Sequence, residues 1–191
     1  LYSSNTYALY SQAIKCGAVP INLGIAKDKP EELEAKIRKG LDCDMILTSG
    51  GVSVGDYDLV KLVLAKMGTD IKFWKVAMRP GKPLAFGHIG GIPVFGLPGN
   101  PVSSMVSFEV FVRPAILKML GQKQEAKKEV EATLEEEIKK RKGLMYFLRA
   151  RTRWVGGIYV TRTTGPQGSG ILKSMALANS LVILPEKEEE V

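Results

Sequence analysis

Histidine and cysteine are scarce in this 191-residue sequence, which has one histidine and two cysteines. A zinc site built on histidines, a Ser-His-Asp triad and a histidine general base are therefore nearly excluded. Cys16 and Cys43 stand apart and form no Cys-x-x-Cys pair. This favours two reduced thiols in a cytoplasmic protein. The chemistry must then come from carboxylates, lysine and arginine, backbone amides or a bound metal.

Long apolar runs, an initiating methionine and two phosphate-binding signatures are also missing. No apolar segment approaches the roughly 20 residues that a membrane-spanning helix needs, so we expect no membrane span. Because the sequence begins with Leu1 and shows no signal peptide, we interpret it as a fragment. A Gly-x-Gly-x-x-Gly fingerprint is absent, and Gly81-Lys82 is followed by proline, which excludes a P-loop.

The formal net charge is +7, which suits either nucleic acid or small anionic substrates. The aromatic residues are not interleaved with the basic ones as they are in nucleic-acid-binding proteins. We therefore expect small anions as ligands and no nucleic acid. Part of the positive charge lies in one basic run, Lys139–Lys142, and an acidic tail from Glu186 to Glu190 opposes it.

Helix and strand patterns alternate over residues 1–121. Capped by Ser4 or Asn5, a first helix should end at Gly17; further helices are predicted at about 30–40, 58–66 and 102–120, the last kinked or broken at Pro114. Strands are predicted at 18–25, 45–47, 73–78, 84–89 and 92–97, with a Gly90-Gly91 hairpin turn joining the last two. This order predicts a three-layer α/β/α domain with a mostly parallel sheet.

The composition changes after residue 121 to a polar linker followed by short strands. Strands are predicted at 129–138, 146–154, 157–163 and 181–184, separated by glycine-rich turns. We therefore divide the chain into an α/β domain, residues 1–121, and a small, barrel-like β domain, residues 122–191.

Three glycine- and proline-rich loops follow predicted strands: Thr48–Asp58, Met78–Pro83 and Gly96–Ser104. Ligands of open α/β sheets bind at the carboxyl ends of the strands, so we expect the loops to form one site. The first loop offers backbone amides beside Asp56 and Asp58, which suits a metal-bridged phosphate ester. A plain structural turn is an equally good interpretation of its glycines.

The other two loops also suit an oxyanion. Lys75, Arg79 and Lys82 surround a rigid Pro-Gly turn and predict a preorganised cationic site, with a solvated basic loop as the alternative. Ser103 and Ser104 begin a predicted helix, where free N–H groups and the helix dipole favour an anion. Simple N-capping by serine is compatible with that interpretation.

Four segments, in this order and spacing, resemble the molybdopterin molybdenumtransferase family, which includes the bacterial protein MoeA and the E domain of gephyrin. They are Asn22–Asp28, Thr48–Asp56, Phe73–Pro83 and Gly96–Ser103, and Thr163–Ser169 continues the match. The resemblance covers nearly the whole chain and implies the last step of molybdenum cofactor biosynthesis. In that step adenylylated molybdopterin and molybdate react, AMP is released and the metal enters the dithiolene. It also implies Mg2+, a homodimer and contact with the adenylyltransferase of the same pathway.

The resemblance assigns roles to individual residues. Catalytic positions are Asp28, Asp58, Lys75 and Arg79, and the metal ligands are Asp56 and Asp58. Substrate-binding positions are Ser49, Gly50, Gly51, Ser53, Lys82, Pro98, Asn100, Pro101, Ser103, Arg149 and Ser169. The two N-terminal domains of the family are absent from this sequence, so the chain alone is expected to be inactive.

Proteins of two other functional classes share part of this sequence pattern. A molybdopterin adenylyltransferase has the same α/β fold, but its glycine-rich loop normally continues with Thr-Gly and it lacks an appended β domain. A non-catalytic scaffold of the gephyrin type would use the β domain and the dimer surface. Such a scaffold has no need of the intact Asp28, Asp58, Lys75 and Arg79 set, which favours the transferase.

Overall fold

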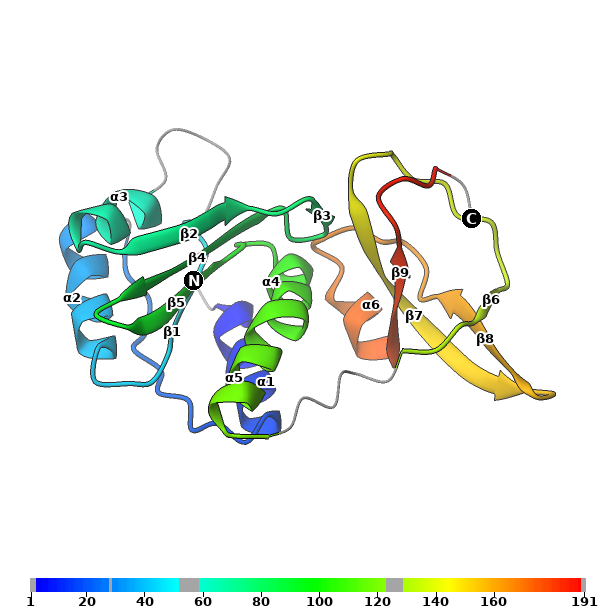
Figure 1. Ribbon diagram of the computed structural model, residues 1–191, viewed down its shortest axis with the longest axis horizontal. Helices are drawn as coiled ribbons and strands as arrows, with labels where there is room; N and C mark the ends of the chain where they lie inside the picture. Colours follow the sequence, from blue (N-terminus) through cyan, green and yellow to red (C-terminus); the bar gives the residue numbers. More distant parts are fainter. Residues whose placement is uncertain (1–2, 28, 52–58, 123–128, 190–191) are drawn as a thin grey trace.

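The computed structural model describes residues 3–27, 29–51, 59–122 and 129–189. Two β-sheets lie towards opposite ends of an elongated molecule, and each has helices packed against it (Figure 1). This arrangement confirms the predicted α/β class with an appended β region. None of the helices in the described ranges is both long and apolar enough to cross a membrane.

The first sheet has four strands in the order β1-β5-β4-β2. Their bounds are β1 Ile46–Ser49, β5 Ile92–Leu97, β4 Pro83–Ile89 and β2 Asp70–Lys75. β1 and β5 are parallel, whereas β4 is antiparallel to both β5 and β2. The hairpin at Gly90-Gly91, with φ of 57° and 88°, is confirmed and reverses the chain between β4 and β5. Because of that reversal, the expectation of a mostly parallel sheet is corrected to a mixed sheet.

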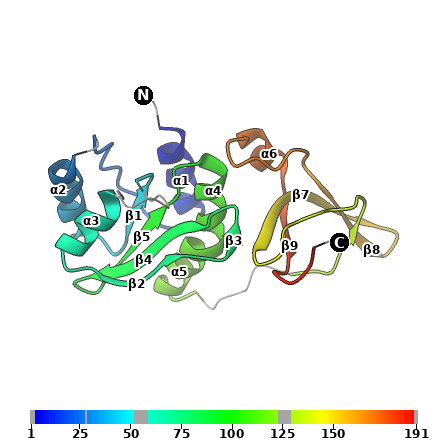
Figure 2. The ribbon, with the colours of Figure 1, turned by 90° about the horizontal axis from the view of Figure 1, so that it is seen from above.

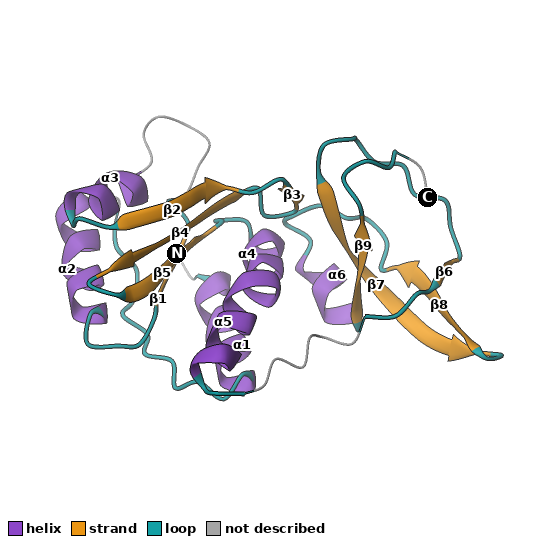
Figure 3. Cartoon of the chain, in the orientation of Figure 1, coloured by secondary structure: helices purple, strands orange, loops and turns teal. Residues whose placement is uncertain are grey.

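Helices cover both faces of the first sheet, which confirms the three layers (Figure 3). One face carries α2 Pro30–Gly40 and α3 Leu59–Lys66; the other carries α1 Ser4–Lys15, α4 Pro101–Ser107 and α5 Arg113–Met119. Ile37 and Val63 are buried against the sheet on the first face, and Phe108 packs with Leu97 of β5 on the second. Removal of these apolar side chains from water stabilises the sandwich.

α4 and α5 belong to one helical segment that a π-helical turn interrupts. This turn, η1, spans Phe108–Val112, and Pro114 lies in the first turn of α5. Proline has no N–H to donate and its ring clashes with the carbonyl four residues earlier, so a wider turn accommodates it. The predicted break at Pro114 is confirmed.

The predicted buried strand at residues 18–25 is wrong. The structure has no strand there, and Val19 and Ile21 are 91% and 66% exposed. An apolar run predicts burial only if another element covers it, and no described element of this chain covers these side chains. The segment instead connects α1 to α2 as an extended coil.

Two smaller predictions also need correction. Ser3, and not Ser4 or Asn5, caps α1, because its Oγ accepts the Thr6 N–H at 3.3 Å. The strand expected at 129–138 is reduced to β6, Thr133–Leu134. Good helix formers and charged residues dominate that segment, so its short alternation of apolar and polar residues is weak evidence for a strand.

The second sheet has the order β3-β7-β8-β6, with β9 also paired to β7. The bounds are β3 Met78–Arg79, β7 Met145–Val155, β8 Ile158–Thr163 and β9 Ser180–Leu184, and α6 is Leu172–Leu177. β7, β8 and β9 confirm the predicted strands. β3 comes from the loop between β2 and β4, and the view from above shows it between the two sheets (Figure 2). The second sheet thus includes residues on the α/β side of the expected boundary at residue 121.

Candidate functional site

The described parts of the three glycine- and proline-rich loops leave the same edge of the first sheet. β1, β5 and β2 end there at Ser49, Leu97 and Lys75, and β4 begins there at Pro83. The pairing requires this arrangement, because β1 and β5 are parallel and β4 runs against both β5 and β2. The sheet topology therefore brings the loops to one edge, as the sequence predicted.

Asn5 joins the first loop to the third. Its Nδ2 donates to Ser49 Oγ at 2.8 Å and to the Gly99 carbonyl at 2.9 Å. Ser49 Oγ in turn donates to the Pro98 carbonyl at 3.3 Å. Asn5 is buried, and sequence reasoning gave it no role beyond a possible cap. Its spacing of four residues from the buried Leu9 places it on the inner side of α1 and was the signal available.

Gly50 and Gly51 give the first loop its shape. Their φ angles are +85° and +71°, a region that side chains with a Cβ rarely adopt. The Gly50 N–H donates to the Leu97 carbonyl at 3.0 Å, so this amide completes the sheet edge. A Cβ on Gly51 would lie 2.8 Å from Val60 Cγ2. Both glycines therefore have a conformational role, and their contact with substrate stays a prediction.

The third loop contacts the segment before α6. Asn100 Nδ2 donates to Ser169 Oγ at 3.0 Å, and the Val102 N–H donates to the Ser169 carbonyl at 3.0 Å. Asn100 is the N-cap of α4 but makes no side-chain capping bond, since its amide reaches Ser169 instead. Pro101 is the first residue of α4 and Ser103 is buried in its first turn. These four predicted residues lie together, and the N-cap position of α4 is occupied by Asn100 and not by a serine.

The second loop divides its predicted cations between the two sheets. Lys75 is the last residue of β2 and pairs with Pro83, while the Val76 N–H donates to the Lys82 carbonyl at 3.1 Å. Arg79 lies in β3 and pairs with Tyr146 of β7. All three cationic side chains are exposed. Lys75 and Lys82 thus remain at the first sheet, whereas Arg79 belongs to the second.

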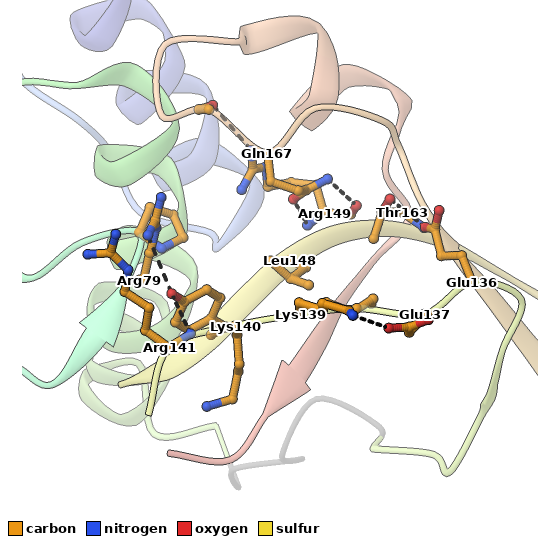
Figure 4. Close-up of a pocket in the computed structure, with 14 residues that line it drawn as sticks. Arg79, Glu136, Glu137, Lys139, Lys140, Arg141, Leu148, Arg149, Thr163 and Gln167 are labelled. Atoms are coloured by element: carbon orange, nitrogen blue, oxygen red, sulfur yellow. Dashed lines mark hydrogen bonds and ion pairs between the residues drawn. The ribbon is translucent and has the colours of Figure 1, made fainter. Parts of the chain in front are cut away.

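A cavity of about 710 Å3 lies where β3 meets β7 (Figure 4). Five basic residues line it: Arg79, Lys139, Lys140, Arg141 and Arg149. Glu136 and Glu137 are the acidic residues of the lining. The cavity wall is therefore positive. Sequence reasoning treated the basic run at 139–142 as a feature of composition, because only the fold brings it beside Arg79.

Both acidic residues of the cavity have partners of their own. Glu136 Oε1 accepts from the Thr163 N–H at 2.7 Å and from Thr163 Oγ1 at 2.5 Å. These hydrogen bonds lower the pKa of the Glu136 carboxyl. Glu137 pairs with Lys139 at 3.0 Å. Neither carboxylate is bonded to Arg79 or Arg149 in the structure.

Arg149 is fully buried and pairs with no carboxylate in the described ranges. Its Nε donates to Ser174 Oγ at 3.1 Å and its Nη2 to the Gly168 carbonyl at 3.2 Å. Nη1 is buried and has no hydrogen-bond partner among the described atoms. Burial lowers the pKa of the guanidinium. An unpaired buried cation is costly, and a guanidinium offers the donors that an oxyanion prefers.

Four predicted site residues lie outside the described ranges: Asp28, Ser53, Asp56 and Asp58. They include both residues expected to bind a metal ion. Within the part of the chain that the structure describes, no group of three or more His, Cys, Asp or Glu side chains could hold a metal.

Two protein-family models match the chain. The model described as "Probable molybdopterin binding domain" matches residues 1–118, and "MoeA C-terminal region (domain IV)" matches residues 131–191. Together they account for both sheets.

Curated relatives match nearly the whole length of this chain. A molybdopterin molybdenumtransferase of Bacillus subtilis is 36% identical over 184 residues, which are 96% of this chain and 43% of the relative. One from Haemophilus influenzae is 37% identical over 195 residues, covering 100% of this chain and 48% of the relative. The chain therefore spans about half the length of the curated relatives it matches.

A crystal structure of a molybdopterin biosynthesis MoeA protein from Pyrococcus horikoshii is also similar. Its TM-score is 0.81 at 32% sequence identity, with 100% of this chain and 45% of that chain covered. The agreement extends over both sheets, so the arrangement described above is the fold of that relative too.

Proposed function

Because the chain belongs to the molybdopterin molybdenumtransferase (MoeA) family, we propose that it forms the substrate-binding part of an enzyme of molybdenum cofactor biosynthesis. That enzyme inserts molybdate into adenylylated molybdopterin and releases AMP. The chain contributes the molybdopterin-binding α/β domain, residues 1–121, and the C-terminal β domain, residues 122–191. The substrates are small oxyanions, which agrees with the positive net charge.

The observation that carries this proposal is the buried Arg149 in its positive cavity. Molybdate is a tetrahedral dianion, and its binding requires cations and hydrogen-bond donors that are already held in place. Arg149 is held by Ser174 and Gly168, which leaves Nη1 without a partner in the described ranges. A dianion bound in the cavity would supply the negative charge that the buried guanidinium lacks.

The loop edge of the first sheet suits the phosphate groups of adenylylated molybdopterin. Lys75 and Lys82 provide exposed cations there. Ser49, the last residue of β1, and Ser103, in the first turn of α4, lie at the same edge. Ser169 contacts the third loop and immediately follows Gly168 of the cavity wall. We therefore assign the loop edge and the cavity to one contiguous site, in which the two oxyanions are bound side by side.

Mg2+ is the divalent cation that we propose for the reaction, with Asp56 and Asp58 as ligands. Among the described side chains no cluster suits a metal, so the proposal depends on these two aspartates and on Asp28. When bound, a divalent cation neutralises phosphate charge and polarises the phosphoanhydride. Lys75 and Arg79 act independently of it by binding oxyanion charge.

The assembly is proposed from the family alone. We propose a homodimer in which each site is completed by further domains, and transient contact with the adenylyltransferase that produces the adenylylated substrate. A match to the MoeA C-terminal region favours this role over the adenylyltransferase itself.

The test is a reconstitution with the intact protein. Adenylylated molybdopterin and molybdate are supplied, and AMP release and molybdenum insertion are measured. We expect AMP release to depend on molybdate and to fall at least tenfold in Lys75→Ala, about 1.4 kcal/mol of lost transition-state binding. Lys72→Ala on the same strand is the matched control, because Lys72 forms an exposed pair with Asp70 at 2.6 Å.

Three results would contradict the proposal. The first is AMP release that is independent of molybdate. The second is formation of adenylate from ATP and molybdopterin, which would make the protein the adenylyltransferase. The third is full activity of Lys75→Ala, which would remove the catalytic assignment of the second loop.

A further inference from the structure

Tyr146 connects two separate basic elements of the cavity. The Arg79 guanidinium carbon lies 5.5 Å from the centre of the Tyr146 ring, and Lys140 Nζ lies 5.3 Å from it. The Tyr146 hydroxyl also accepts from Arg79 Nη1 at 3.4 Å and from the Arg141 backbone N–H at 3.4 Å. One buried tyrosine therefore contacts cations from β3 and from the basic run.

The strand pairing places Arg79 beside this ring. Arg79 and Tyr146 are register partners in the parallel pair of β3 and β7, so their side chains are neighbours across the ladder. An arginine side chain has high rotamer entropy, so the exposed Arg79 would otherwise sample many rotamers. Contact with the ring restricts it before any substrate arrives.

Lys140 is held to the same ring from the other basic element. It is 8% exposed, which is unusual for lysine. Its Nζ donates to the Leu144 carbonyl at 3.2 Å and to the Glu186 carbonyl at 3.4 Å. In the described ranges, no carboxylate is paired with this ammonium. These contacts make the Lys139–Arg141 segment a fixed wall of the cavity.

We propose that Tyr146 is a positioning residue of the oxyanion site, and that its ring fixes Arg79 and Lys140 as the two arms of a cationic cluster. The assignment of molybdate to this cluster rests on the proposed function. Two cations that share one ring repel each other, and a bound dianion offsets that repulsion. The basic run thereby becomes part of the substrate site.

The aromatic ring of Tyr146 contributes more than its hydroxyl to holding the two cations in place. Both hydrogen bonds to the Tyr146 hydroxyl are 3.4 Å long, at the weak end of the range for N–H donors. The attraction between a cation and an aromatic ring grows as the pair is buried, and here two cations contact one buried ring. Loss of the ring should therefore matter more than loss of the hydroxyl alone.

The test uses the intact protein with molybdate alone, titrated calorimetrically, together with KM for molybdate and kcat in the insertion assay. For Tyr146→Leu we expect molybdate affinity to fall about tenfold and KM to rise by the same factor, with kcat changed by less than about twofold. For Tyr146→Phe, which retains the ring, we expect affinity within about twofold of the wild type.

Lys140→Met tests the same wall without removal of the buried ring, and we expect about a threefold loss of molybdate affinity. Tyr159→Leu is the matched control, because Tyr159 contacts Trp154 at 4.7 Å on the same sheet and does not line this cavity. Its molybdate affinity should equal that of the wild type.

The outcomes separate the two proposals. If wild-type protein inserts molybdenum but Tyr146→Leu and Lys140→Met bind molybdate normally, the positioning role is overturned and the proposed function stands. If Tyr146→Phe loses as much affinity as Tyr146→Leu, the ring is not the positioning element. If the wild type inserts no molybdenum, the proposed function fails, and the calorimetric series still decides whether Tyr146 organises an oxyanion site.

Discussion

Replacement of Arg149 by methionine should remove oxyanion binding while leaving the fold nearly as stable as before. Arg149 is 0% exposed and pairs with no carboxylate in the described ranges. Burial of an unpaired guanidinium lowers the stability of the folded state unless a ligand offsets its charge. Methionine fills a similar space with a flexible apolar chain and carries no charge.

The magnitude follows from two opposing terms. The variant loses the hydrogen bonds from Nε to Ser174 Oγ and from Nη2 to the Gly168 carbonyl, each contributing about 1.5–3 kcal/mol for a charged donor. It also avoids the cost of a buried, unpaired guanidinium, which is several kcal/mol. Ser174 Oγ keeps its bond to the Ile171 carbonyl at 2.6 Å. The free energy of unfolding should therefore change by less than about 2 kcal/mol.

The assay is thermal denaturation of the intact protein with and without molybdate. A ligand at 100 times its Kd stabilises the folded state by about 2.7 kcal/mol, which raises Tm by roughly 5–10 °C for a domain of this size. The wild type should show that shift and Arg149→Met should lose it. Arg153→Met is the matched control on the same strand, because Arg153 is exposed and pairs with Glu135 at 3.0 and 2.5 Å.

Two results would refute this reasoning. If Arg149→Met is destabilised by more than about 4 kcal/mol, the guanidinium is needed for the fold itself and its burial is no sign of a ligand. If Arg149→Met keeps the full molybdate shift, the oxyanion binds elsewhere in the protein.

Two further predictions concern the loop edge and the acid side of the stability profile. Asn5→Ala should lower the free energy of unfolding by about 1–3 kcal/mol and reduce kcat/KM, because the bridge between Ser49 and Gly99 is lost; equal urea midpoints for variant and wild type would contradict this. The pKa of Glu136 is lowered by hydrogen bonds, so its contribution to stability is fully present above pH 4.5, the ordinary value, and is lost as the pH falls through the lowered pKa. Glu136→Gln should accordingly flatten acid unfolding monitored by circular dichroism below pH 4.5, and identical acid profiles would argue against the bonded carboxylate.

Local patterns in the sequence predicted most elements of the fold. The Gly90-Gly91 turn between two alternating runs predicted the β4–β5 hairpin, because only glycine adopts its positive φ angles easily. Pro114 predicted the interruption between α4 and α5 for an equally local reason. The prediction of a buried strand at the apolar run 18–25 is wrong, because burial requires other helices or strands to cover the run and local composition does not specify them.

The candidate site was predictable in part. Lys75 and Asn100 belong to segments whose glycines and prolines mark them in the sequence, and the strand order brings their loops to one edge. Ser169 was expected from the family resemblance alone, and its hydrogen bond with Asn100 places it beside the third loop. The assignments of Asp28, Asp56 and Asp58 stay predictions, since these residues lie outside the described ranges. Asn5, by contrast, was predicted as a possible helix cap, whereas its buried side chain bridges Ser49 and Gly99.

The sequence by itself determined the chemical character of the candidate site. One histidine, isolated cysteines and three loops rich in glycine, proline and cations predict oxyanion binding through lysine, arginine and backbone groups. Only the tertiary structure decided where the charges meet. The pairing of β3 with β7 brings Arg79, Tyr146 and the basic run to one cavity, whose lining also includes Arg149. Charge and turn propensity are properties of short segments, whereas burial of a cation without a partner depends on every element packed around it.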